Sequence, residues 1–188
     1  MRFFNLVVAG VSFVVVLALP SPVWSQESGV KGGFILMAPM GDSNAYLLDS
    51  NKQVRHRWPC GEGPANATYL LEDGSLLRTK RVQNPLFNAR GGAGGGVKKI
   101  AWDGTLLWDY TVSDESLHHH HDVEPMPNGN VLVIAWERHT REEAIAAGRD
   151  PQSMSTDVLW SESILELKPK GMDDAEVVWQ WRQWEHLV

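Results

Sequence analysis

The sequence predicts an all-β fold, a β-propeller of four-stranded blades, of which this chain holds about three. The first observation is a repeated turn. Asp73-Gly74 and Asn128-Gly129 each lie between short Leu- and Val-rich runs, and the two glycines are 55 residues apart. Tight hairpins favour such pairs because their central residues need positive φ. The second observation is a strand-like run that ends in tryptophan three times, at Trp58, Trp108 and Trp179. The intervals are 50 and 71 residues, and propeller blades recur at roughly 40–50 residues.

Residues 1–25 are predicted to form a secretory signal peptide. Arg2 supplies a positive charge, an apolar run of 14 residues extends from Leu6 to Leu19, and Ser25 offers a small residue before the cleavage point. A run of about 7–15 apolar residues is typical of a signal peptide, whereas a membrane span needs about 20. An uncleaved anchor is the alternative. We therefore expect residues 26–188 to form a periplasmic or secreted domain, a partial β-propeller with no stable membrane span after cleavage.

The strands of the three blades are expected in order along the domain. Residues 33–38, 45–48 and 53–58 predict a first, incomplete blade. The hairpins of the second blade are expected at 67–71 with 75–80, and at 97–102 with 105–110. The third blade is expected at 122–125, 130–136, 158–167 and 176–181. Three blades do not close a ring, so we expect a truncated or partial propeller that self-associates through its open edges.

One segment interrupts the strand pattern. Residues 141–147, REEAIAA, are strong helix formers and are followed by Gly148 and Pro151. Glycine and proline end helices, so we expect a short helix in a loop insertion. The insertion accounts for the longer third interval between tryptophans.

Composition excludes some classes of function. The formal net charge of −6 argues against a nucleic-acid partner, because phosphate binding needs a basic face. Cys60 is the only cysteine, so we expect a buried residue or a free thiol, with no internal disulfide. Of the 9 tryptophans, Trp24 lies in the predicted signal peptide, and the other eight are expected to pack between blades.

The glycine-rich run at residues 91–96, GGAGGG, does not match a phosphate-binding loop. No Gly-Lys-Ser/Thr follows it, and Val97 occupies the last glycine position of the dinucleotide-binding pattern. We expect a flexible or tightly packed loop.

The histidine cluster at residues 118–121 is the best indication of chemistry. Imidazole accepts or donates a proton near neutral pH. Strand alternation predicts His119 and His121 on one face, with the other two histidines on the opposite face. Asp122 is placed to orient a neighbouring ring, while Glu137 and Arg138 are candidates for the rim of the same site. Adventitious metal binding or a solvated loop are the alternatives for the histidines.

Residues 120–137, HHDVEPMPNGNVLVIAWE, resemble the signature segment of bacterial arylsulfotransferases. Residues 91–108, in which the glycine-rich loop leads into WDGTLLW, are also similar to that family. The resemblance extends over roughly residues 34–188, and the histidine segment is its specific part.

The resemblance implies an exported propeller enzyme that transfers a sulfuryl group from a phenolic sulfate ester to a phenol, with no nucleotide donor, cofactor or metal. His121 and His120 would contact the substrate or the sulfuryl group, and the nucleophilic histidine would lie on a later blade, outside this chain. Family members close six blades and are far longer, and some depend on a disulfide that Cys60 alone does not form. Whether this chain is active by itself is therefore left open.

Two other functions fit the same pattern of blades. One is a non-catalytic propeller that binds a ligand or protein, in which the tryptophans serve only to pack blades together. The other is a fragment of a quinone-dependent propeller dehydrogenase. That enzyme needs carboxylate and amide ligands around its cofactor, and the sequence singles out no such set.

Overall fold

The computed structural model describes residues 32–87 and 91–187. Within these ranges the protein is nearly all β, as predicted, with three antiparallel sheets of three or four strands. The predicted signal peptide lies outside the described residues. No helix of the described chain is long and apolar enough to span a membrane.

Each sheet is a meander in which neighbours in sequence are neighbours in space. The first sheet contains β1 (Ile35–Met37), β2 (Asn44–Leu48) and β3 (Val54–Pro59). The second contains β4 (Pro64–Leu70), β5 (Leu76–Arg81), β6 (Gly95–Ile100) and β7 (Leu106–Thr111). The third contains β8 (Leu117–Pro125), β9 (Val131–Thr140), β10 (Val158–Lys170) and β11 (Asp174–Arg182).

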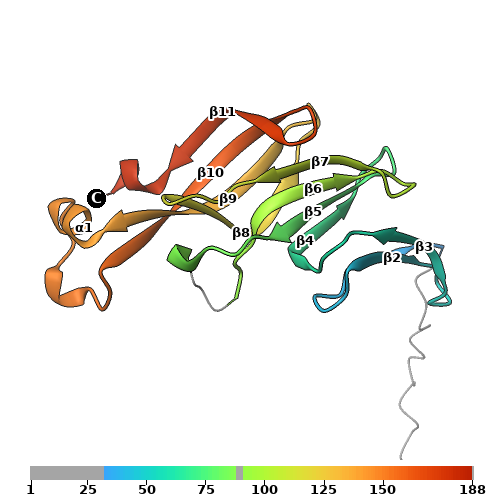
Figure 1. The fold of residues 1–188 in the computed structure, drawn as a ribbon, viewed down its shortest axis with the longest axis horizontal. Coiled ribbons are helices and arrows are strands. Elements are labelled where there is room, and N and C mark those ends of the chain that lie inside the picture. The colour runs from blue at the N-terminus through green and yellow to red at the C-terminus, as the bar shows by residue number, and fades with distance from the viewer. Residues whose placement is uncertain (1–31, 88–90, 188) are drawn as a thin grey trace, which may run out of the picture.

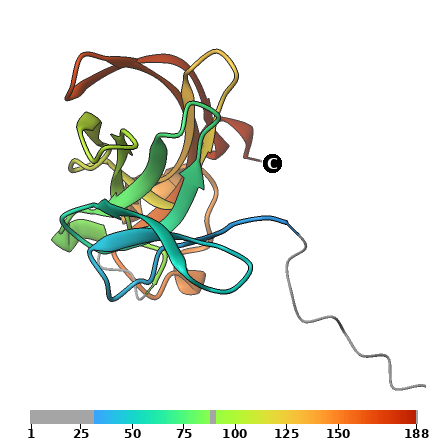
Figure 2. The same cartoon turned by 90° about the vertical axis from the view of Figure 1, so that its right-hand side faces the viewer.

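The three sheets follow one another along the long axis of the molecule. Figure 1 shows the first sheet at one end and the third sheet, with the helix, at the other. In Figure 2 the first sheet lies nearest the viewer, in front of the other two. The second sheet is therefore covered on both faces by a neighbour.

The predicted turns form where glycine permits them. Gly74, Gly104 and Gly129 have φ of 78°, 90° and 83° and connect β4 to β5, β6 to β7 and β8 to β9. The preceding Asp73 accepts a hydrogen bond from the backbone amide of Ser75 at 2.9 Å. Glycine adopts this left-handed conformation without the steric penalty of a Cβ atom.

Two apolar cores hold the sheets together. Trp58, Leu76 and Ile100 belong to the core between the first and second sheets, which also buries Cys60. Trp108 and Val133 belong to the core between the second and third sheets. The two tryptophans confirm the expectation of packing between sheets. Trp102 also packs between the first and second sheets, since it stacks on His56 of β3 with ring centroids 3.8 Å apart, although 48% of it is exposed. Trp179, also 48% exposed, belongs to neither core.

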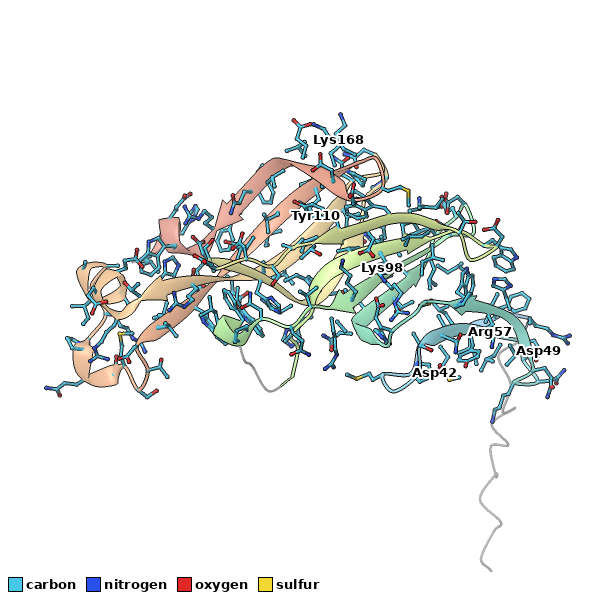
Figure 3. The ribbon with its side chains drawn as sticks, viewed as in Figure 1. Asp42, Asp49, Arg57, Lys98, Tyr110 and Lys168 are labelled. Carbon is cyan, nitrogen blue, oxygen red and sulfur yellow. The ribbon has the colours of Figure 1, made fainter. Side chains whose placement is uncertain are left out.

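Charged side chains also lie in the second sheet. Lys98 of β6, labelled in Figure 3, forms an ion pair with Glu62 at 2.7 Å. A second carboxylate, that of Asp109 on β7, lies 3.5 Å from the same ammonium group and also pairs with Lys80. Figure 3 places Lys98 between Arg57, at the end formed by the first sheet, and Lys168, on the third sheet. The contacts compensate the lysine charges at the centre of the molecule.

The predicted helix is present as α1 (Arg141–Ala146) between β9 and β10. Thr140 caps it, because its hydroxyl accepts from the Glu143 amide at 3.2 Å and the Glu143 carboxylate accepts from the Thr140 amide at 2.7 Å. Three short 3₁₀ turns complete the fold: η1 (Pro85–Phe87), η2 (Pro151–Ser153) and η3 (Gln183–His186).

Candidate functional site

The histidine cluster lies in a strand held between β9 and the glycine-rich run. β8 begins at Leu117, earlier than the expected start at Asp122. On one side His119 pairs with Ala135 of β9. On the other side the amide of Gly94 donates to the His119 carbonyl at 3.1 Å. Backbone pairing on both sides makes an extended strand of residues whose types do not favour one.

The glycine-rich run is a tightly packed segment. A Cβ atom on Gly92 would overlap with the imidazole ring of His121, and one on Gly94 would overlap with the ring of His119. A Cβ on Gly95 would lie 2.5 Å from Val82. Glycine is needed here because the backbone lies too close to the rings to leave room for a side chain. The glycine-rich run therefore packs directly against the histidine cluster. Of the two forms expected for it, a flexible or a tightly packed loop, it adopts the tightly packed one.

Strand alternation holds for the first three histidines and fails at the fourth. His118 and His120 lie on the face of Trp136, and His119 points to the opposite face, towards the second sheet. A bulge then shifts the register between His119 and Val123, and His121 adopts a φ of 54°. Bulges redirect side chains in this way. The prediction that His119 and His121 share a face is therefore wrong.

The bulge leaves a cluster with three buried rings and one exposed ring. His118, His119 and His120 have exposed fractions of 1%, 0% and 4%, whereas His121 is exposed. His118 contacts the Ser113 hydroxyl at 2.8 Å and stacks on Phe87. Burial lowers the pKa of each of the three buried rings. Only His121 is placed to meet a ligand from solvent.

His119 is neutral and fixed in one tautomer. Its Nδ1 atom accepts a hydrogen bond from the Gly95 amide at 3.1 Å, so the proton is on Nε2. Desolvation, reinforced by His120 nearby, lowers the pKa of His119 to about 3. Its Nε2 atom has no partner within the described residues. His119 is thus a packing and backbone-bonding residue.

His120 connects the exposed ring to a carboxylate. Its Nε2 atom lies 2.7 Å from Oε2 of Glu162 on β10, and its Nδ1 atom lies 2.7 Å from Nδ1 of His121. The His120 ring also stacks on Trp136, with centroids 4.3 Å apart. Burial lowers the pKa of His120, and the bond to Glu162 opposes that effect. The three side chains form a chain of hydrogen bonds, Glu162–His120–His121.

The exposed ring lies at an open groove between β4 and β8. The groove has a volume of about 430 Å³ and is lined by Asn66, Ala67, Thr68, Tyr69, His121 and Asp122. The Tyr69 hydroxyl donates to Asp122 at 2.8 Å. Desolvation and this carboxylate raise the pKa of Tyr69 to about 12, so the phenol stays protonated at neutral pH. Asp122 therefore holds Tyr69 and its own Val123 amide and does not orient a histidine ring.

Only two of the four site residues predicted from sequence lie together at the groove. His120 and His121 contact each other at the groove. Glu137 points to the opposite face of the third sheet, where it accepts from Arg182 and, at 3.0 Å, from Ser163. Arg138 follows it on β9, where its backbone amide donates to the Ser116 carbonyl, and it does not line the groove. Glu137 is thus part of an internal ion pair.

Two side chains of the site, Glu162 and Tyr69, were not predicted. Glu162 is 42 residues from His120 in sequence. It comes beside the ring because β10 pairs with β9 in a register that places it opposite Trp136. Tyr69 comes from the predicted hairpin of the second sheet, and its contact with Asp122 joins two sheets. Neither contact has a local sequence signal, because each depends on how two separate strands align.

In residues 32–87 and 91–187, no three His, Cys, Asp or Glu side chains converge as a metal site would require. The chain matches no protein-family model, and the curated proteins include no significant match.

Proposed function

We propose that this protein is a β-propeller of the arylsulfotransferase type and that it transfers a sulfuryl group between phenols at the groove beside His121. The observation on which the proposal depends is an exposed imidazole in an open groove, supported from behind by a second imidazole and a carboxylate. The resemblance of residues 120–137 to the family signature supplies the reaction class.

The three sheets support the propeller part of the proposal. The second and third sheets are four-stranded antiparallel meanders, which is the form of a propeller blade. The second sheet packs against a neighbour on each face, and the third packs against the second on one face. We interpret the first sheet as a blade with three of its strands described. Under this interpretation β4 and β8 are the inner strands of adjacent blades, and the groove between them faces the propeller axis.

Sulfuryl transfer needs the groups that the groove offers. The acceptor phenol must lose its proton as its oxygen attacks sulfur, and the donor phenol must regain one as it leaves. His121 is the exposed imidazole at the groove, and an imidazole can both accept and donate a proton. The Asn66 amide, which donates to the Gly92 carbonyl at 3.1 Å, and the protonated Tyr69 lie on the opposite wall. We assign His121 the contact with the phenolic oxygen and His120 the support of that ring.

The proposal is tested by following 4-nitrophenol release from 4-nitrophenyl sulfate, with and without added phenol. We expect phenol-dependent release by the purified protein and a loss of at least about 100-fold in the His121→Ala variant, the scale of general acid–base catalysis. The matched control is His186→Ala, which removes another exposed histidine, in η3, far from the groove in sequence and fold.

Equal loss in both variants, or release that does not depend on phenol, contradicts the proposal. A folded protein that gives no release but binds the sulfate ester would instead identify a non-catalytic binding module.

A further inference from the structure

We propose that Glu162 is a positioning residue that fixes the tautomer of His121, through His120, so that the Nε2 atom of His121 is an unprotonated proton acceptor at the groove. This inference rests on the proposed function for its chemistry. The tautomer itself is a property of the protein alone, and it is measured without any substrate.

The hydrogen-bond chain allows one arrangement of protons when Glu162 is ionised. A carboxylate only accepts hydrogen bonds, so the 2.7 Å contact with His120 requires a proton on His120 Nε2. A neutral imidazole then has a lone pair on Nδ1. The 2.7 Å contact between the two Nδ1 atoms therefore requires the proton of His121 on its Nδ1. The remaining atom, His121 Nε2, has a free lone pair.

Burial strengthens this assignment. His120 is 4% exposed and stacked on Trp136, so its second proton is disfavoured and the ring stays neutral. The Glu162 side chain is 43% exposed, and water can therefore stabilise its charge. His121 Nε2 makes no hydrogen bond to any other described residue, so nothing in those parts of the chain competes for its lone pair.

The other charged and titratable side chains nearby do not compete with the hydrogen bonds that link Glu162, His120 and His121. On β8 itself, His118 and His119 are buried and of lowered pKa, and Asp122 is bonded to Tyr69 of β4. The β9 residue stacked on His120 is the uncharged Trp136. Among the described residues, Glu162 of β10 is the acidic side chain that contacts the pair directly.

The tautomer gives His121 a defined role in transfer. The acceptor phenol gives its proton to His121 Nε2 as its oxygen forms the new S–O bond. The S–O bond to the donor phenol breaks, and the leaving phenolate takes that proton back from Nε2. Between these two proton transfers His121 carries a positive charge. That charge is shared with His120 through the Nδ1 contact and is stabilised by the negative charge of Glu162. The proton, the sulfuryl group and the electrons all balance without a further reactant.

The test is the protonation state of His121 in uniformly ¹⁵N-labelled protein, measured by long-range ¹H–¹⁵N NMR correlations at pH 7.5. The His121→Ala spectrum assigns the signals. We expect the Nδ1–H form of His121 in the wild type and a mixture with the Nε2–H form in Glu162→Ala. The control is Glu166→Ala on the same face of β10, where Glu166 accepts from Asn128 at 3.2 Å and also bonds Asn130; we expect no change there. An Nε2–H form in the wild type, or a tautomer that Glu162→Ala leaves unchanged, overturns the inference.

Activity provides a separate readout. We expect Glu162→Ala to lower kcat/KM for phenol-dependent release about 10- to 100-fold, a loss smaller than that of removing the base itself. Glu162→Asp, which retains a carboxylate, should recover part of that loss, and Glu166→Ala should have the wild-type rate. The expected tautomer in a protein that lacks transferase activity would refute the proposed function alone. Activity with the opposite tautomer would refute the positioning role alone.

Discussion

Replacing the buried His119 by asparagine should make the protein markedly less sensitive to acid. The Nδ1 atom of His119 accepts from the Gly95 amide, and the Oδ1 atom of asparagine occupies a nearly equivalent position. His119→Asn therefore keeps the backbone bond while it removes a titratable ring. It also removes the Nε2 donor, which has no partner within the described chain.

The magnitude follows from the shifted pKa. The ordinary pKa of histidine is 6.5, and that of His119 is lowered to about 3 because burial opposes its charge. Since the folded-state pKa is depressed, the stabilisation is fully present above pH 6.5 and is lost as pH falls towards 3. A difference of one pKa unit between the folded and unfolded states corresponds to about 1.4 kcal/mol of folding free energy. Between pH 7 and pH 4 the wild type should lose about 3 kcal/mol through this residue alone.

The assay is urea unfolding followed by tryptophan fluorescence at pH 7, 5.5 and 4 for both proteins. The smaller side chain lowers the stability of His119→Asn at every pH, by an amount of order 1–2 kcal/mol, so the informative quantity is the slope against pH. His118, His120 and His139 are also lowered in pKa, but they contribute equally to both proteins. Parallel stability curves for wild type and variant would refute the assignment of His119 as a buried neutral ring.

Two further predictions concern packing and assembly. Gly94→Ala should destabilise the protein by about 2–3 kcal/mol in urea unfolding, because the added Cβ would overlap with the His119 ring. The control is Gly41→Ala, which should be nearly neutral because nothing lies within 4 Å of its Cβ position. Equal losses of stability in the two variants would contradict the reasoning. Self-association through open blade edges remains a prediction. The outer face of the third sheet is a further surface that we expect to take part, since Ile134 and Ile164 line an apolar hollow of about 270 Å³ there. Ile164→Glu should then lower the sedimentation coefficient measured at high protein concentration, and an unchanged coefficient would exclude that face.

The order of strands could be predicted from sequence because the turns are local. Asp-Gly and Asn-Gly pairs between apolar runs indicate hairpins, and the three glycines at those turns have the expected positive φ. The helix was likewise predictable, since residues 141–147 are strong helix formers and are followed by Gly148 and Pro151. These signals need only a few neighbouring residues, and tertiary contacts did not override them.

The site could be predicted only as a set of residue types. Four adjacent histidines indicated a reactive or ligand-binding site. Which of the four rings is exposed depends on the bulge at His121, which interrupts the alternation of side chains along β8. Glu137 follows Trp136 directly, and the same alternation places it on the face opposite Trp136, with Arg182. The side chain that does reach the histidines, Glu162, depends on the register between β9 and β10. Register between distant strands has no signature within either strand.

The glycine-rich run and the histidine cluster determine together where charge is tolerated. Gly94 and Gly95 approach the rings of His119 and His118, Phe87 stacks on His118, and Trp136 stacks on His120, so these three rings are buried. Burial lowers the pKa of those three rings, and of the four neighbours only His121 is exposed to solvent. Its φ of 54° is a conformation that costs about 1–3 kcal/mol for a residue with a Cβ atom. Pairing on both sides of β8 maintains that conformation, because a relaxed backbone would lose the 2.7 Å bond from the His121 amide to the Gly92 carbonyl. The packed, neutral histidines thus hold one strained, exposed ring at the groove. A substitution in the glycine-rich run that weakens its packing should therefore change the conformation of His121, although His121 itself is not substituted.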